Sequence, residues 1–166
     1  MKEEQFKVLK TLVEATSRMD VNLFAEKVNL TPDQTIAVIQ ELAKDGFLQR
    51  VGGGFGITKK GKAVLKAFTP APKGSGFHFY YGVDQPSDFT AESLEQFYSI
   101  IKQISPESLE FHVYRGDFEN WLKEACKDPE LASEIERVKA ADLKAEDLRK
   151  ELLKVINAKS GIEELL

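Results

Sequence analysis

Apolar residues in the N-terminal part of the chain recur three and four positions apart, which is the spacing of amphipathic helices. Over residues 3–17 this pattern predicts a first helix. A second, shorter helix is expected over residues 21–28, with Asp20 as its cap. A third is expected between Thr31 and Gly46, because this segment opens on a Thr-x-x-Gln capping box with proline at the first helical position.

The segment after the third helix has the composition of a β-hairpin. FLQRVGGGFGIT, residues 47–58, predicts two short strands around a glycine turn, and KKGKAVLKAF, residues 59–68, predicts a further short helix. The GGGFG run lacks the Lys-Ser/Thr ending of a phosphate-binding loop. We therefore assign its glycines to the turn.

The stretch TPAPKGSG contains two prolines and two glycines and little apolar surface, which is typical of a linker. It divides the chain into an expected first domain of residues 1–68, a linker of residues 69–76 and a second domain of residues 77–160. Residues 161–166 are expected to form a short tail.

Two segments of the second domain are rich in aromatic and β-branched residues. FHFYYG predicts a strand over residues 77–82, and LEFHVY predicts one over residues 109–114. Between them, an amphipathic helix capped by Thr90 is expected over residues 90–104. Because a strand, a helix and a strand in this order are long enough for a crossover, we expect the two strands to be parallel neighbours.

Helices are expected to fill the rest of the second domain, with Asp117 and Asp128 as N-caps. Their ranges are about 117–126, 129–140 and 144–158. The expected fold class is therefore α+β, with a mostly helical C-terminal domain built on a small parallel two-stranded β-α-β core.

The stretch VNLFAEKVNLTPDQTIAVIQELAKDGFLQRVGGGFGITKKGKAVL, residues 21–65, resembles the winged helix-turn-helix superfamily, in the manner of the MarR- and ArsR-type regulators. LFAEKVNLT matches the second helix and turn, and TPDQTIAVIQELAKDGFLQR matches the recognition helix running into a wing strand. The resemblance implies an N-terminal winged helix-turn-helix domain and a DNA-binding transcription regulator. In such a domain one helix enters the major groove while basic wing residues hold phosphates.

On the third helix we expect Ile36, Ile39 and Leu42 to be buried. The outward residues then supply the candidates for base contacts, which are Gln34, Ala37, Val38, Gln40 and Lys44. The candidates for phosphate contacts lie in and just after the hairpin and are Arg50, Lys59, Lys60 and Lys62. Ala37 and Val38 are apolar where the superfamily often has polar or basic residues. An alternative therefore stays open: a protein-interaction adaptor whose winged helix docks or dimerises and binds no DNA.

The charge of the chain is divided unevenly along its length. Residues 1–70 carry 11 Lys and Arg against 8 Asp and Glu, whereas residues 71–166 carry 12 against 19. A mildly basic module is thus joined to an acidic one.

The two histidines of the chain lie in related local sequences, FHFYY and FHVYR. On parallel strands in register they would fall side by side, with a tyrosine next to each on the same face. This arrangement predicts a candidate pocket for a phosphate or a carboxylate, formed by His78, Tyr80, His112, Tyr114 and Arg115. Two alternatives stay open: structural histidines bonded to backbone or tyrosine, and a two-histidine metal site with Glu110 or Asp117 as third ligand.

The C-terminal segment also contains SLEQF, SLEFHVYRGDFENWL and DPELA. These runs are similar to the marks of a family of uncharacterised domains that are common in archaea. The resemblance implies no activity.

The remaining residues argue against several classes of protein, namely zinc proteins, enzymes and membrane proteins. The single cysteine, Cys126, forms no CxxC or Cys/His spacing of a zinc site, and no nucleophile with a base and an orienting group is recognisable. We therefore expect no enzyme activity, no cofactor and no metal. Without an apolar run of about 20 residues or a signal peptide, the expected location is cytoplasmic and away from membranes. The expected partners are DNA, a second copy in a homodimer, and a protein or a small anionic effector.

Overall fold

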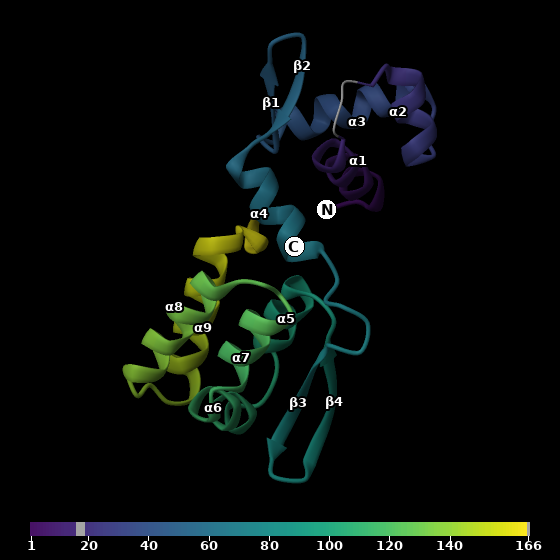
Figure 1. Ribbon diagram of the computed structural model, residues 1–166. Coiled ribbons are helices and arrows are strands. Elements are labelled where there is room, and N and C mark those ends of the chain that lie inside the picture. The colour runs from purple at the N-terminus through teal and green to yellow at the C-terminus, as the bar shows by residue number, and fades with distance from the viewer. Residues whose placement is uncertain (16–18, 166) are drawn as a thin grey trace. The chain divides into compact units, whose positions relative to one another are not determined.

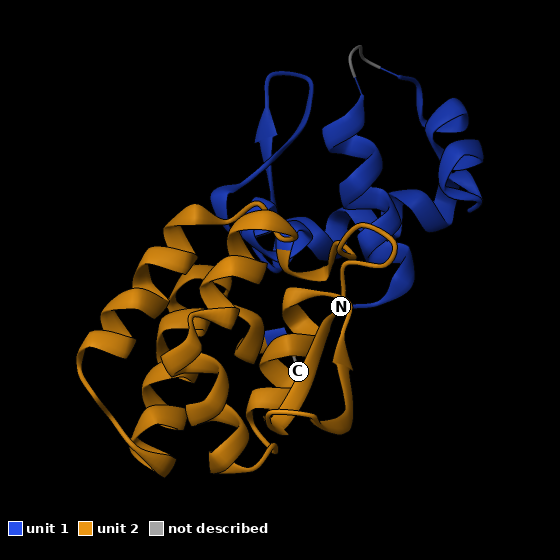
Figure 2. Ribbon diagram, turned by 60° about the horizontal axis from the view of Figure 1, so that its bottom comes forward, with its two compact units in different colours: residues 1–66, 165–166 blue, residues 67–164 orange. Residues whose placement is uncertain are grey.

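A computed structural model describes residues 1–15 and 19–165 (Figure 1). The chain divides into two compact units, which Figure 2 colours separately. Unit 1 consists mainly of residues 1–66, and unit 2 consists of residues 67–164. The division falls two residues before the end of the first domain expected from the sequence, within a helix that spans it.

Unit 1 contains helices and one antiparallel hairpin, in the order expected from the sequence. Their bounds are α1 (Glu3–Glu14), α2 (Val21–Val28), α3 (Pro32–Lys44), β1 (Leu48–Val51), β2 (Gly54–Ile57) and α4 (Lys59–Phe68). The predicted caps are confirmed: Asp20 accepts hydrogen bonds from the first turn of α2, and Thr31 and Gln34 form the capping box of α3. The first helix was expected to reach residue 17. It ends at Glu14, and residues 16–18 lie outside the described residues.

The face of α3 that packs into unit 1 differs from the expectation. Thr35, Val38 and Leu42 form the buried stripe, whereas Ile36 is 42% exposed. Both stripes have helical spacing, so the pattern alone did not distinguish them. Thr35 can face the core because its hydroxyl donates a hydrogen bond to the Thr31 carbonyl oxygen (2.9 Å) within the same helix.

The hairpin of unit 1 is packed closely against α4 at Gly61. A β-carbon at this position would lie 2.3 Å from the Phe47 carbonyl oxygen and 2.7 Å from Ile57 Cγ1. Any larger residue would therefore push α4 away from the base of the hairpin.

We expect Gly61→Ala to lower the free energy of unfolding of unit 1 by about 1–3 kcal/mol, because the added methyl group overlaps backbone. Loss of far-UV circular dichroism in urea would then begin before the fluorescence change of the single tryptophan, Trp121, which reports on unit 2. The matched control is Gly54→Ala, where a β-carbon meets nothing within 4 Å. Equal midpoints for the two variants would contradict the packing argument.

Unit 2 consists of an antiparallel hairpin packed against helices (Figure 1). Its elements are β3 (Phe77–Gly82), β4 (Gln85–Ala91), α5 (Leu94–Ile101), α6 (Pro106–Arg115), α7 (Asp117–Glu124), α8 (Pro129–Ala140), α9 (Ala145–Ser160) and a 3₁₀ turn (Ile162–Leu165). Alternate residues of β3, Phe77 and Phe79, are buried among the helices. The expected tail is part of this packing, because Ile162 is fully buried.

The expected parallel β-α-β core is wrong, because LEFHVY lies in a helix. Ser105 caps α6 by accepting a hydrogen bond from the Ser108 N–H, and Pro106 occupies the first helical position. Gly116, with φ of 77°, ends the helix in the left-handed conformation that glycine tolerates. A helix with both ends specified thus outweighs the strand propensity of its aromatic and β-branched residues.

The second strand of unit 2 is β4, which follows β3 through a tight turn. Thr90 pairs with His78 across this hairpin, so its expected role as a helix cap is wrong. The cap of α5 is Ser93, which accepts a hydrogen bond from the Gln96 N–H. Asp128 caps α8 as predicted.

The segment expected to be a linker, residues 69–76, is hydrogen-bonded to the rest of unit 2. The Ala71 N–H donates to the Glu92 carbonyl oxygen, and the Trp121 indole N–H donates to the Ser75 carbonyl oxygen at 2.7 Å.

Among the described residues, no helix has the length and hydropathy that a membrane span requires.

Candidate functional site

The outer face of α3 and the neighbouring hairpin carry most of the residues expected to contact DNA. Exposed residues of this group are Gln34, Ala37, Gln40, Lys44, Arg50, Lys59, Lys60 and Lys62. Val38 is only 8% exposed, so the expectation that it faces outward is wrong. It lies in the stripe that α3 turns toward the core, where no external partner reaches it.

Lys60 is held by unit 1 itself. Its Nζ atom donates to the Asp45 carbonyl oxygen (3.1 Å) at the end of α3, and it lies 4.9 Å from the centroid of the Phe47 ring. A cation at the C-terminus of a helix stabilises the helix dipole. Lys60 therefore secures the junction of α3, β1 and α4.

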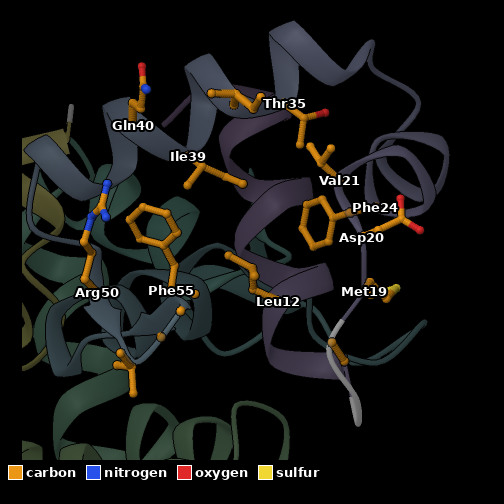
Figure 3. A pocket seen from close by; sticks show the side chains of 16 residues that line it. Leu12, Met19, Asp20, Val21, Phe24, Thr35, Ile39, Gln40, Arg50 and Phe55 are labelled. Atoms are coloured by element: carbon orange, nitrogen blue, oxygen red, sulfur yellow. The ribbon is translucent and has the colours of Figure 1, made fainter.

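A groove of about 860 Å³ lies between the hairpin and the helices of unit 1 (Figure 3). Figure 3 shows the side chains of Ile39 and Phe55 directed into the space between α3 and the hairpin, with Leu12 and Phe24 continuing the apolar lining. The Arg50 guanidinium lies at one end, 5.5 Å from the centroid of the Phe55 ring. The sequence reading missed this groove because it assigned Ile36 and Ile39 to the core.

A second pocket, of about 490 Å³, lies in unit 2 between β3, the turn after it, and the adjoining parts of α6 and α7. Of the residues expected to form a site, His78, Tyr80, His112 and Arg115 line this pocket. Tyr114 does not, and its hydroxyl donates to the Leu143 carbonyl oxygen. Because α6 is a helix, residues two positions apart point in nearly opposite directions, and Tyr114 faces away from His112.

His112 is 3% exposed, and both of its ring nitrogens are hydrogen-bonded. Nε2 accepts from the Tyr80 N–H (2.8 Å), and Nδ1 lies 2.9 Å from Asp117 Oδ2. The backbone N–H can only donate, so the ring proton resides on Nδ1 and the imidazole is neutral. Burial lowers the pKa of His112 below its ordinary value of 6.5, although Asp117 acts in the opposite direction.

The two histidines are not side by side. His78 is exposed on β3, where its Nδ1 atom bonds Thr90 Oγ1 at 3.0 Å, whereas His112 lies beneath the strand on α6. They share the pocket as separate parts of its wall. Within residues 1–15 and 19–165, no group of three His, Cys, Asp or Glu side chains is placed to hold a metal ion.

Asp117 and Asn120 also line the pocket, and the sequence reading did not assign them to it. Asp117 was expected to cap α7, but its carboxylate binds His112 and Arg115, and Gly116 occupies the cap position. The left-handed Gly116 reverses the chain, so that Asp117 returns to the last turn of α6. The sequence signal for the contact between Asp117 and His112 was a glycine followed by an acidic residue directly after a helix.

The neutral state of His112 predicts how the stability of unit 2 depends on pH. Below pH 6.5 the unfolded chain takes up a proton that folded His112 resists, so the free energy of unfolding should fall as pH decreases from 6.5. The slope from this single group is at most about 1.4 kcal/mol per pH unit. Urea unfolding followed by Trp121 fluorescence measures it.

His78→Gln serves as the matched control, because it removes the exposed histidine. The slope of the free energy of unfolding between about pH 7.5 and 5.5 should then stay as in wild type. His112→Gln should abolish it and lower stability at every pH. A wild-type slope that survives His112→Gln would show that another group is responsible.

Glu119, on α7, is 8% exposed, and its Oε1 atom has no hydrogen-bond partner among the described residues. Burial raises the pKa of this carboxyl, with Lys139 opposing the shift. Ionised Glu119 therefore destabilises the fold at neutral pH, and stability is regained as pH falls and the carboxyl is protonated.

We expect Glu119→Gln to raise the free energy of unfolding at pH 7 by up to about 1 kcal/mol. The difference from wild type should shrink as pH falls toward 4.5, the ordinary pKa of a glutamate. Glu124→Gln, an exposed neighbour on the same helix, should change little. A destabilised Glu119→Gln protein at neutral pH would rule out the burial argument.

Comparison with known proteins gives one family. The model of the family of unknown function DUF5752 matches residues 63–157, which is more than half of the chain and includes nearly all of unit 2. No curated protein and no solved structure matches the chain.

Proposed function

The chain belongs to the family of unknown function DUF5752, and we propose that it is a cytoplasmic DNA-binding transcription regulator. In this proposal unit 1 is a winged helix-turn-helix domain, with α3 as the recognition helix and β1–β2 as the wing. Unit 2 senses an effector or binds a partner. A homodimer would present two copies of α3 to two half-sites of an operator.

The observation that carries the proposal is the exposed polar face of α3, together with basic residues on the hairpin and on α4. Gln40 and Lys44 are exposed on this face, and Arg50 is exposed on β1. A glutamine amide can bind adenine through two hydrogen bonds and a lysine can bind guanine, while the Ala37 methyl group suits contact with thymine. Unit 1 also has the positive charge balance that phosphate contact requires.

The phosphate contacts are assigned to Arg50, Lys59 and Lys62. Lys60 is left out of the test variant, because its replacement would disturb the end of α3. Each phosphate contact contributes a slope of about −0.9 to the dependence of log affinity on log salt. Between about 50 and 200 mM salt, three contacts account for roughly 40-fold of the loss in affinity.

Fluorescence anisotropy with a mixed-sequence duplex of about 30 base pairs tests this assignment. The variant Arg50→Gln/Lys59→Gln/Lys62→Gln should bind more weakly than wild type at low salt and with a flatter salt dependence. The control variant Lys73→Gln/Lys123→Gln/Lys150→Gln removes the same charge from exposed positions of unit 2 and should bind as wild type does. Equal, salt-independent binding by all three proteins would reject the assigned phosphate contacts, and no binding by wild type at low salt would reject DNA binding.

A second candidate function is favoured by the groove of unit 1. Val21, Ile36 and Val51 line it with exposed fractions of 38%, 42% and 58%. Exposed apolar side chains gathered in one place mark interaction surfaces. They support a protein-interaction adaptor that uses unit 1 for docking or dimerisation and binds no DNA.

Sedimentation equilibrium tests whether the groove of unit 1 is a dimer surface. If the groove is a dimer surface, Ile36→Glu should raise the dimer dissociation constant, because a charge would be buried in an apolar contact. The surface control is Asp33→Lys, an exposed position of α3 that does not line the groove. A wild-type chain that is monomeric at all concentrations would exclude dimerisation through this surface.

A further inference from the structure

We infer that the pocket of unit 2 binds a small monocarboxylate with an apolar or aromatic body, and that Arg115 anchors the carboxylate. The inference rests on the effector-sensing part of the proposed function and is independent of DNA binding. It starts from the way in which unit 2 holds Arg115 at the pocket wall.

Arg115 is oriented by a chain of contacts that begins in the core. The Tyr80 N–H fixes the ring of buried His112, and His112 Nδ1 binds Asp117 Oδ2. The same carboxylate oxygen lies 3.3 Å from Arg115 Nε. The guanidinium carbon Cζ also lies over the Phe111 ring, 4.6 Å from its centroid. Arg115 is therefore held by Asp117 at Nε and by the Phe111 ring.

This arrangement leaves one edge of the guanidinium for a ligand. Within the described part of the chain, Nη1 and Nη2 of Arg115 donate no hydrogen bond, and the approach to Asp117 is closest at Nε. Two parallel N–H groups on one edge match the two oxygens of a carboxylate. Because the side chain is held beforehand, binding costs less conformational entropy than it does for a free surface arginine.

The charges of the pocket favour a monoanion over a phosphate. Arg115 is the sole arginine or lysine in the lining, and its charge is partly balanced by Asp117. Asp84 adds a second carboxylate to the same wall. A phosphate dianion would meet too little positive charge there, whereas a single carboxylate is matched by one guanidinium edge. The Asn120 amide and the His78 ring line the same pocket and can complete its hydrogen bonding.

The rest of the lining is suited to an apolar body. Phe77, Tyr80 and Phe111 contribute rings, and Val83 in the turn after β3 is 68% exposed at the rim. The volume of about 490 Å³ lies within the range of small-molecule sites, which are mostly apolar with a few placed polar groups. An aromatic acid the size of phenylacetate combines the two features.

The test measures binding of phenylacetate to the full chain by isothermal titration or by ligand-observed NMR, without DNA. Its neutral analogue, 2-phenylethanol, and inorganic phosphate are measured in parallel. Wild type should bind phenylacetate saturably and more tightly than either of these. Arg115→Gln should bind phenylacetate at least about tenfold more weakly, because one bidentate charged contact is lost. Its affinity for 2-phenylethanol should stay unchanged, which a misfolded pocket would not allow.

Two further variants sharpen the test. Arg137→Gln removes a guanidinium on α8 that pairs with Glu134 outside the pocket, and it should bind phenylacetate as wild type does. Arg115→Lys keeps the charge without the fork and should lie between wild type and Arg115→Gln.

Three outcomes would overturn the inference: no saturable binding of phenylacetate by wild type, equal binding by Arg115→Gln, or tighter binding of phosphate than of phenylacetate. None of them bears on the anisotropy experiment with DNA. Conversely, a failure of DNA binding would leave the titration intact, so the two proposals fail separately.

Discussion

The arrangement of unit 2 depends on which groups bind the backbone N–H and carbonyl groups along the inner edge of its two-stranded hairpin. β4 pairs with one edge of β3, and the register shifts at Tyr80. On the other edge, α6 supplies side chains in place of a third strand. His112 accepts from the Tyr80 N–H (2.8 Å), and Ser108 Oγ donates to the Tyr80 carbonyl oxygen (2.7 Å). Because a buried backbone group without a partner is costly, this helix is fixed to this strand at one residue.

The same interaction connects the core to the pocket. A histidine that accepts a backbone N–H at Nε2 must carry its proton on Nδ1, so it presents a donor to Asp117. Asp117 in turn meets Arg115 Nε. Protonation of His112 at Nε2 would break the hydrogen bond that this atom accepts from the Tyr80 N–H. It would therefore weaken both the attachment of α6 to β3 and the orientation of Arg115. Structure and candidate site are thus coupled through one imidazole.

The sequence predicted features that are set by local chemistry. The caps at Asp20, Thr31 and Asp128 act over three residues and follow from side-chain type alone. The failures depended on contacts between distant residues. LEFHVY has strand-like residues, yet Ser105 and Gly116 delimit a helix whose polar side chains fit the edge of β3. Which face of α3 is buried was likewise decided by packing, because apolar residues cover both sides of that helix.

The candidate pocket shows how a correct grouping can arise from an incorrect geometry. The sequence reading grouped His78, Tyr80, His112 and Arg115 on parallel strands, and these four line one pocket although the second segment is helical. The grouping survives because β3 and α6 are in direct contact in either arrangement. The predicted directions of the side chains on residues 109–114 are wrong. A strand places residues two apart on one face, whereas a helix separates them, and Tyr114 therefore leaves the site.

The extent of the family match separates the two proposed activities. Residues 63–157 contain every residue that lines the pocket of unit 2, whereas α3 and the hairpin of unit 1 lie before this range. If the pocket binds a carboxylate, the property belongs to the segment that defines the family and can occur without a DNA-binding partner domain. DNA binding through α3 would instead belong to what precedes that segment. The two proposed activities, ligand binding and DNA recognition, are therefore assigned to different parts of this chain, and α4 spans the division between the units.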